Sequence, residues 1–84
     1  MSLEKVREYI KSNEKTLAEI GQVSDLFYFH MDRGNIEALN KSVSELRTAW
    51  QENLNHKVKE GGEGKEELRA AIKVLDTILR LVNN

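Results

Sequence analysis

Apolar residues recur at alternating spacings of three and four along almost the whole chain, and proline is absent. This spacing places one apolar stripe along a helix, and the lack of proline removes the strongest helix breaker. The remaining breakers are glycines, which gather near Gly34 and over residues 60–64. The sequence therefore predicts three helices, over about residues 3–32, 36–59 and 65–83, with a flexible loop at 60–64.

The first predicted helix carries the longest apolar stripe. Ser2 can cap its free backbone N–H groups, while Gly34 and Asn35 follow it as a left-handed residue and as the cap of the next helix. One alternative stays open, because residues 16–19 match the capping-box pattern and Gly21 costs about 1 kcal/mol relative to alanine inside a helix. A break there would give four helices. The stripe consists of Leu3, Val6, Ile10, Asn13, Leu17, Ile20, Ser24, Phe27 and Met31.

Short connections make successive helices antiparallel neighbours, so we expect an all-α fold. Its architecture is an up-down-up antiparallel three-helix bundle, in a single domain over residues 1–84. In this arrangement the first and third helices run parallel. At ~1.5 Å per residue the third helix is shorter than the first by about 17 Å. Val82 should then lie near Lys41, which leaves the tip of the first hairpin, about residues 25–40, uncovered.

This tip carries the most apolar segment of the chain, Leu26-Phe27-Tyr28-Phe29. Successive side chains on a helix point about 100° apart, so one neighbouring helix cannot cover all four. Phe27 belongs to the stripe, which leaves the others for a partner. The alternative is that the C-terminal tail, or a kink at Gly21, covers the segment as ordinary core. The predicted partner or oligomer interface comprises Leu26, Tyr28, Phe29, His30, Ile36 and Leu39.

Size and composition favour self-association. Chains below ~100 residues bury a small core and usually gain stability from disulfides, metals or a partner, and this 84-residue chain has no cysteine. We therefore expect two tips to pack together as a homodimer, or one tip to bind a helix of another protein. No apolar run approaches the ~20 residues that span a bilayer, and no signal-peptide pattern is visible, so the expected location is cytoplasmic.

Basic residues form two rows at i, i+4 and i+8, one on the first and one on the third predicted helix. If these helices run parallel, the rows start near the same end and form one positive surface for phosphates or an acidic partner. The alternative is a solvated charged face, because 13 lysines and arginines oppose 14 acidic residues and only Tyr9 lies near enough to stack on bases. The possible basic patch comprises Arg7, Lys11, Lys15, Lys65, Arg69 and Lys73.

The sequence offers little for catalysis or metal binding. Its only histidines, His30 and His56, belong to different predicted helices, and neither the His-x-x-x-His spacing nor a phosphate-binding loop occurs. Trp50 lies on the stripe of the second helix and is expected in the core. We expect no cofactor, no metal and no small-molecule substrate.

These features predict a non-catalytic helical interaction module, which acts as an adaptor, a small chaperone, or a regulatory or inhibitory subunit. The alternative function is a nucleic-acid-associated helical domain that uses the two basic rows. A third is an enzyme subunit whose active site another chain completes.

Overall fold

The computed structural model describes residues 2–84, and every regular element in that part of the chain is a helix. The all-helical fold class is confirmed, and the last two helices match the predicted second and third helices closely. The elements are α1 (Leu3–Ser12), α2 (Glu14–Leu17), the short 3₁₀ turn η1 (Ala18–Ile20), α3 (Val23–Asp32), α4 (Ile36–Glu60) and α5 (Lys65–Val82).

The predicted helix caps are present. The side-chain oxygen of Ser2 accepts a hydrogen bond from the backbone N–H of Lys5 at 3.5 Å, and that of Asn35 accepts one from Ala38 at 3.1 Å. These bonds satisfy backbone donors that have no partner within the first turn of a helix. Gly34 has a φ of +65°, so it supplies the left-handed turn between α3 and α4.

The single helix predicted over residues 3–32 is wrong, because the chain is interrupted twice in this stretch. α1 ends at Asn13, whose side-chain amide donates to the backbone carbonyl of Tyr9 at 2.8 Å. The second interruption is at Gly21, which has φ +109° and ψ −170°, a conformation that residues with a Cβ rarely adopt. The break near Gly21, stated above as an alternative, is therefore the observed one.

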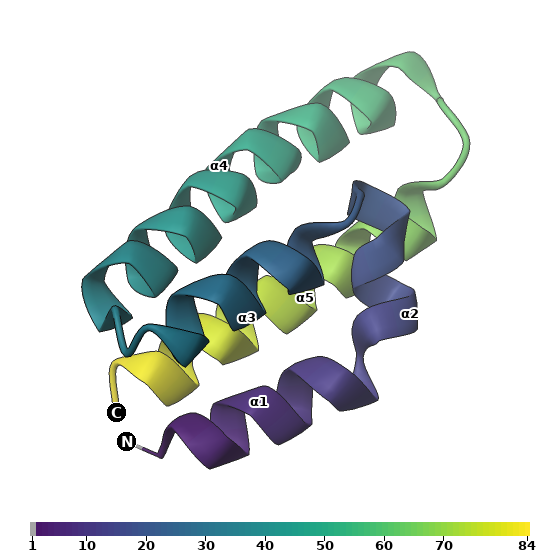
Figure 1. Ribbon diagram of the computed structural model, residues 1–84. Helices are drawn as coiled ribbons and strands as arrows, with labels where there is room; N and C mark the ends of the chain where they lie inside the picture. The colour runs from purple at the N-terminus through teal and green to yellow at the C-terminus, as the bar shows by residue number, and fades with distance from the viewer. Residues whose placement is uncertain (1) are drawn as a thin grey trace.

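This division reverses the chain. Figure 1 shows α1, α3, α4 and α5 running in alternating directions, with both chain ends at one end of the molecule. Ser2 and Lys5 line a surface hollow together with Leu81 and Asn84, while residues 15–19 lie beside the start of α5. The expected parallel arrangement of the first and last helices is wrong, because α1 lies antiparallel to α5.

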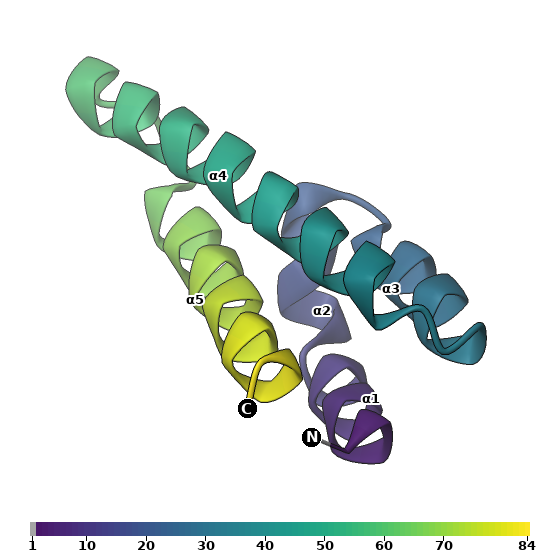
Figure 2. The ribbon, with the colours of Figure 1, turned by 90° about the vertical axis from the view of Figure 1, so that its left-hand side faces the viewer.

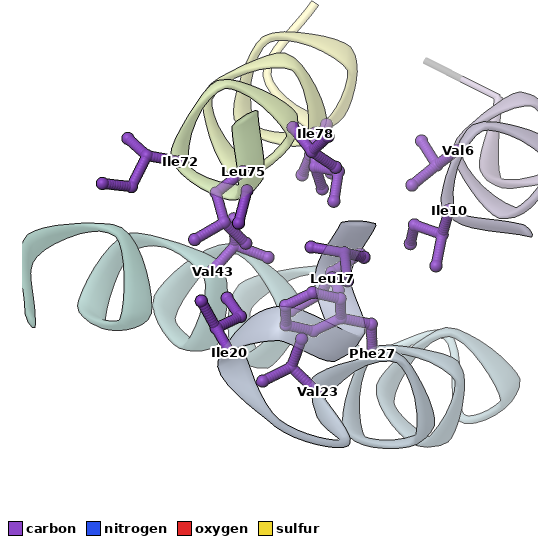
Figure 3. Packing of buried hydrophobic residues seen from close by; sticks show 14 of the residues in the cluster. Val6, Ile10, Leu17, Ile20, Val23, Phe27, Val43, Ile72, Leu75 and Ile78 are labelled. Carbon is purple, nitrogen blue, oxygen red and sulfur yellow. The ribbon is translucent and has the colours of Figure 1, made fainter. Parts of the chain in front are cut away.

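The core draws apolar side chains from all the helices. Figure 3 shows the ring of Phe27 between Val23 on one side and Leu17 on the other, with Val43 of α4 and Ile78 of α5 beyond Leu17. Phe27 has no exposed surface. The fully buried large side chains are Phe27, Ile10, Leu17, Leu39, Leu75, Ile78, Val6 and Val43.

α4 and α5 pack as an antiparallel hairpin with a well-defined register. Near the chain end the side-chain amides of Asn40 and Asn83 hydrogen-bond to each other, at 3.1 and 3.3 Å. Two turns further along α4, Arg47 Nε donates to Asp76 Oδ1 of α5 at 2.6 Å. This register confirms that Val82 lies near residue 41. In both ribbon views α3 lies alongside only the N-terminal half of α4 (Figures 1 and 2).

Candidate interaction surface

Two exposed large apolar side chains lie together on α3. Among residues 2–84, the large apolar side chains with substantial exposure are Leu26 at 43%, Phe29 at 51% and Val58 at 48%. Leu26 and Phe29 are three residues apart on α3, so they are neighbours on one face of that helix. We call these two side chains the α3 ridge. Val58 stands alone near the end of α4.

Two cationic or polar groups border the Phe29 ring. The guanidinium carbon of Arg33 lies 4.6 Å from the ring centroid, a distance typical of a cation–π contact. The His30 ring meets it edge to face, with centroids 5.6 Å apart and planes at 69°. Both contacts come from α3 or its end. They border the ring, which stays 51% exposed.

The structure does not bring all six predicted interface residues to the surface. Leu39 is fully buried, so it belongs to the core and cannot contact a partner. Ile36 is half-buried against the same core. His30 is half-buried, and its Nε2 lies 3.1 Å from the hydroxyl of Ser42 on α4. The physical reason is that Leu39 continues the α4 stripe and therefore faces the bundle rather than the tip.

Tyr28 is half-buried, because α1 covers the face of α3 that the predicted three-helix bundle had left exposed. Because the chain reverses after α2, α1 lies against α3, and the Arg7 guanidinium carbon sits 5.3 Å from the Tyr28 ring centroid. Arg7 also forms an ion pair with Asp32. The Tyr28 hydroxyl donates to Glu14 Oε1 at 2.5 Å. Partial burial, followed by this hydrogen bond, raises the pKa of Tyr28 above its ordinary value.

The two basic rows do not start at the same end of the molecule, because α1 and α5 are antiparallel. Arg7 is turned toward Asp32 and Tyr28 of the α3 region, whereas Lys15 lines a hollow with Glu67 and the neighbouring part of α5. Arg69 pairs with Glu66 within its own helix at 3.1 Å. The expected parallel direction of the two rows is therefore wrong, whereas a shared positive surface stays a prediction, because α1 and α2 both contact α5.

The two histidines of the chain lie on different helices. His30 is on α3 and His56 is on α4, where His56 pairs with Glu60 at 3.2 Å. Over residues 2–84, no three His, Asp or Glu side chains come close enough together to hold a metal ion. Within the same part of the chain, no helix combines the length and the apolar character needed to cross a membrane.

No protein-family model, curated protein or solved structure matches this chain.

Proposed function

We propose that this protein is a non-catalytic helical interaction module that pairs with a second copy of itself through the α3 ridge. The observation that supports this proposal is the joint exposure of Leu26 and Phe29 on one face of a single helix. Contiguous exposed apolar side chains cost free energy in water, and a partner surface removes that cost. The aromatic ring is also the residue type that most often anchors an interface.

The order of charges along α3 favours a second copy as the partner. Asp25, Phe29 and Arg33 follow one another at i, i+4 and i+8, so an acidic, an apolar and a basic side chain form one row. If two α3 helices pack antiparallel around a two-fold axis at Phe29, Asp25 of each copy faces Arg33 of the other. The row is thus complementary to itself, as an isologous interface requires.

The pairing is expected to be weak. Stable specific interfaces bury more than about 1,000 Å² in total, whereas the ridge belongs to a helix of only 10 residues. We therefore expect association only at high protein concentration, with a dissociation constant of roughly 0.1–1 mM.

Sedimentation equilibrium over a concentration series up to about 1 mM tests this proposal, since the expected dissociation constant falls within that range. The wild type should pass from monomer to dimer, and the Leu26→Ser/Phe29→Ser variant should remain monomeric. Val58→Ser is the matched control, because it removes an equally exposed apolar side chain from α4 and should dimerise like the wild type. A wild type that stays monomeric throughout the series contradicts the proposal.

A charge exchange tests the antiparallel geometry. Arg33→Asp places two acidic side chains opposite each other at both ends of the interface, so it should weaken pairing. Adding Asp25→Arg restores opposite charges in the reversed order and should recover it. If the double variant pairs no better than Arg33→Asp alone, the two helices do not meet in this way.

A further inference from the structure

A surface hollow lies at the opposite end of the molecule from the turn between α3 and α4. It has a volume of about 500 Å³ and is formed where the C-terminal half of α4 passes η1 and the start of α5. None of its lining residues belongs to α3, so it is separate from the α3 ridge. We call it the Trp50 hollow. Its lining residues are Glu19, Trp50, Lys57, Glu63, Gly64, Glu67 and Leu68.

The hollow combines apolar surface with acidic side chains. Trp50 is half-buried against the core and Leu68 is buried, so an indole ring and an aliphatic side chain supply the apolar part. Three carboxylates surround them, and they come from three different elements: Glu19 from η1, Glu63 from the loop and Glu67 from α5. A side chain with an apolar stem and a positive end has matching chemistry.

Lys57, the one basic residue of the lining, does not pair with the carboxylates of the hollow, so they can bind a cation. Lys57 Nζ donates to the backbone carbonyl of Glu63 at 3.3 Å rather than to a carboxylate. Within residues 2–84, the ion pairs of the structure involve other acidic side chains. Three carboxylates thus oppose one ammonium group in the hollow. A bound cation would gain electrostatic attraction without displacing an existing ion pair.

The arrangement favours an organic cation over a metal ion. Metal ions require several ligand atoms at one point, and no three acidic or histidine side chains in residues 2–84 converge in that way. A guanidinium group spreads its charge over a plane of several atoms and also binds the face of an aromatic ring, for which tryptophan is the best residue.

We propose that the Trp50 hollow binds an alkyl guanidinium group, with its stem against Trp50 and Leu68 and its charge among the three carboxylates. The group is either an arginine side chain of a protein segment or a free alkyl guanidine. The binding does not depend on pairing through α3.

Trp50 is the only tryptophan of the chain, so its fluorescence reports on the hollow directly. The test is a titration at low salt with N-acetyl-arginine amide and, in parallel, with N-acetyl-citrulline amide, which has nearly the same shape but no charge. We expect a saturable change with the arginine compound only, and weaker binding as salt rises. The chemical shift of the indole N–H serves as a second readout.

Charge-removing variants test whether the carboxylates of the Trp50 hollow bind the cation. Glu19→Gln/Glu67→Gln removes two carboxylates of the hollow and should weaken binding about tenfold, as expected for the loss of two charge contacts. Glu8→Gln/Glu37→Gln changes the net charge equally, at exposed positions outside the lining, and should bind like the wild type. Circular dichroism checks that each variant is folded.

A third ligand identifies the source of the cation. N-butylguanidinium has no peptide groups, so tighter binding of the arginine amide indicates a protein segment, and the reverse order indicates a small molecule. Either order supports the site. The proposal is wrong if neither readout changes, if arginine and citrulline compounds bind alike, or if the two double variants bind with equal affinity.

Discussion

Two phenylalanines that are two positions apart on α3 have opposite environments. Phe27 has no exposed surface, whereas Phe29 is 51% exposed. Two steps along a helix rotate a side chain by about 200°, so one ring points into the bundle and the other away from it. The alternating spacing of apolar residues predicts Phe27 as core correctly. The same spacing leaves both Tyr28 and Phe29 off the stripe, but it cannot predict that Tyr28 becomes half-buried while Phe29 stays exposed, because that difference depends on the neighbours that the helix acquires.

This pair allows a matched stability comparison. Phe27→Ala should lower the free energy of unfolding by about 3–5 kcal/mol, because it removes a large buried ring and leaves a cavity. Phe29→Ala should change it by less than about 1 kcal/mol, since the exposed ring contributes little to the core. Denaturant unfolding followed by circular dichroism at low protein concentration measures both. Equal losses in the two variants would show that the burial assigned to these rings is incorrect.

Tyr28 should make stability depend on pH in the alkaline range. Burial and the hydrogen bond to Glu14 raise its pKa in the folded state, so folding favours the neutral phenol. Its stabilising contribution is therefore fully present below the unfolded-state pKa near 10 and is lost as pH rises above that value. The free energy of unfolding should fall above pH ~10, and the advantage of the wild type over Tyr28→Phe should shrink there.

The phenolate absorbance provides a direct measurement. Subtracting the alkaline titration of Tyr28→Phe from that of the wild type isolates the ionisation of Tyr28. We expect a midpoint above the ordinary tyrosine value of about 10. A midpoint at or below that value would contradict the hydrogen-bonded, partly buried environment of this side chain.

At the scale of elements, the division of the first predicted helix is the main feature that the spacing rule misses. A continuous helix would keep every local hydrogen bond, yet α1 could then not fold back over α3 and α5. The fold instead buries Val6 and Ile10 completely, and burial of one such side chain is worth about 1.5–3 kcal/mol. The sequence does contain signals for this division. They are the two polar residues on the apolar stripe, Asn13 and Ser24, and Gly21 between them.

Substitution of Gly21 distinguishes a continuous first helix from the observed break, because the two predict stability changes of opposite sign. Inside a continuous helix, Gly21→Ala would stabilise the protein by about 1 kcal/mol. In the observed fold the φ of +109° is unfavourable for alanine although its Cβ would meet nothing within 4 Å, so we expect a loss of about 1–3 kcal/mol. The sign of the change in denaturant unfolding decides the question.

Gly62→Ala is the matched control for this substitution. Gly62 lies in the loop between α4 and α5 without a positive φ, and an added Cβ would make only an ordinary contact with Lys57 Cγ at 3.5 Å. Its effect should be small, within about 0.5 kcal/mol. Gly21→Ala that stabilises the protein would contradict the break.

At the scale of the whole molecule, local rules predict the parts better than their arrangement. The all-helical class, the caps at Ser2 and Asn35 and the α4–α5 register follow from glycine positions, capping residues and helix lengths. The path of the chain cannot be predicted from these local features, because one reversal near Gly21 changes which helices are neighbours. That reversal covers Tyr28, makes the two basic rows run in opposite directions and leaves the α3 ridge as the large apolar surface of the tip that stays exposed.

The antiparallel placement of α1 and α5 at the chain ends has a mechanical consequence. Both ends leave the molecule on the same side, next to one another. A force that pulls them apart would act across the contact between these helices rather than along it. Contacts would then break one after another instead of all at once, so the molecule should open under a small load when stretched by its ends.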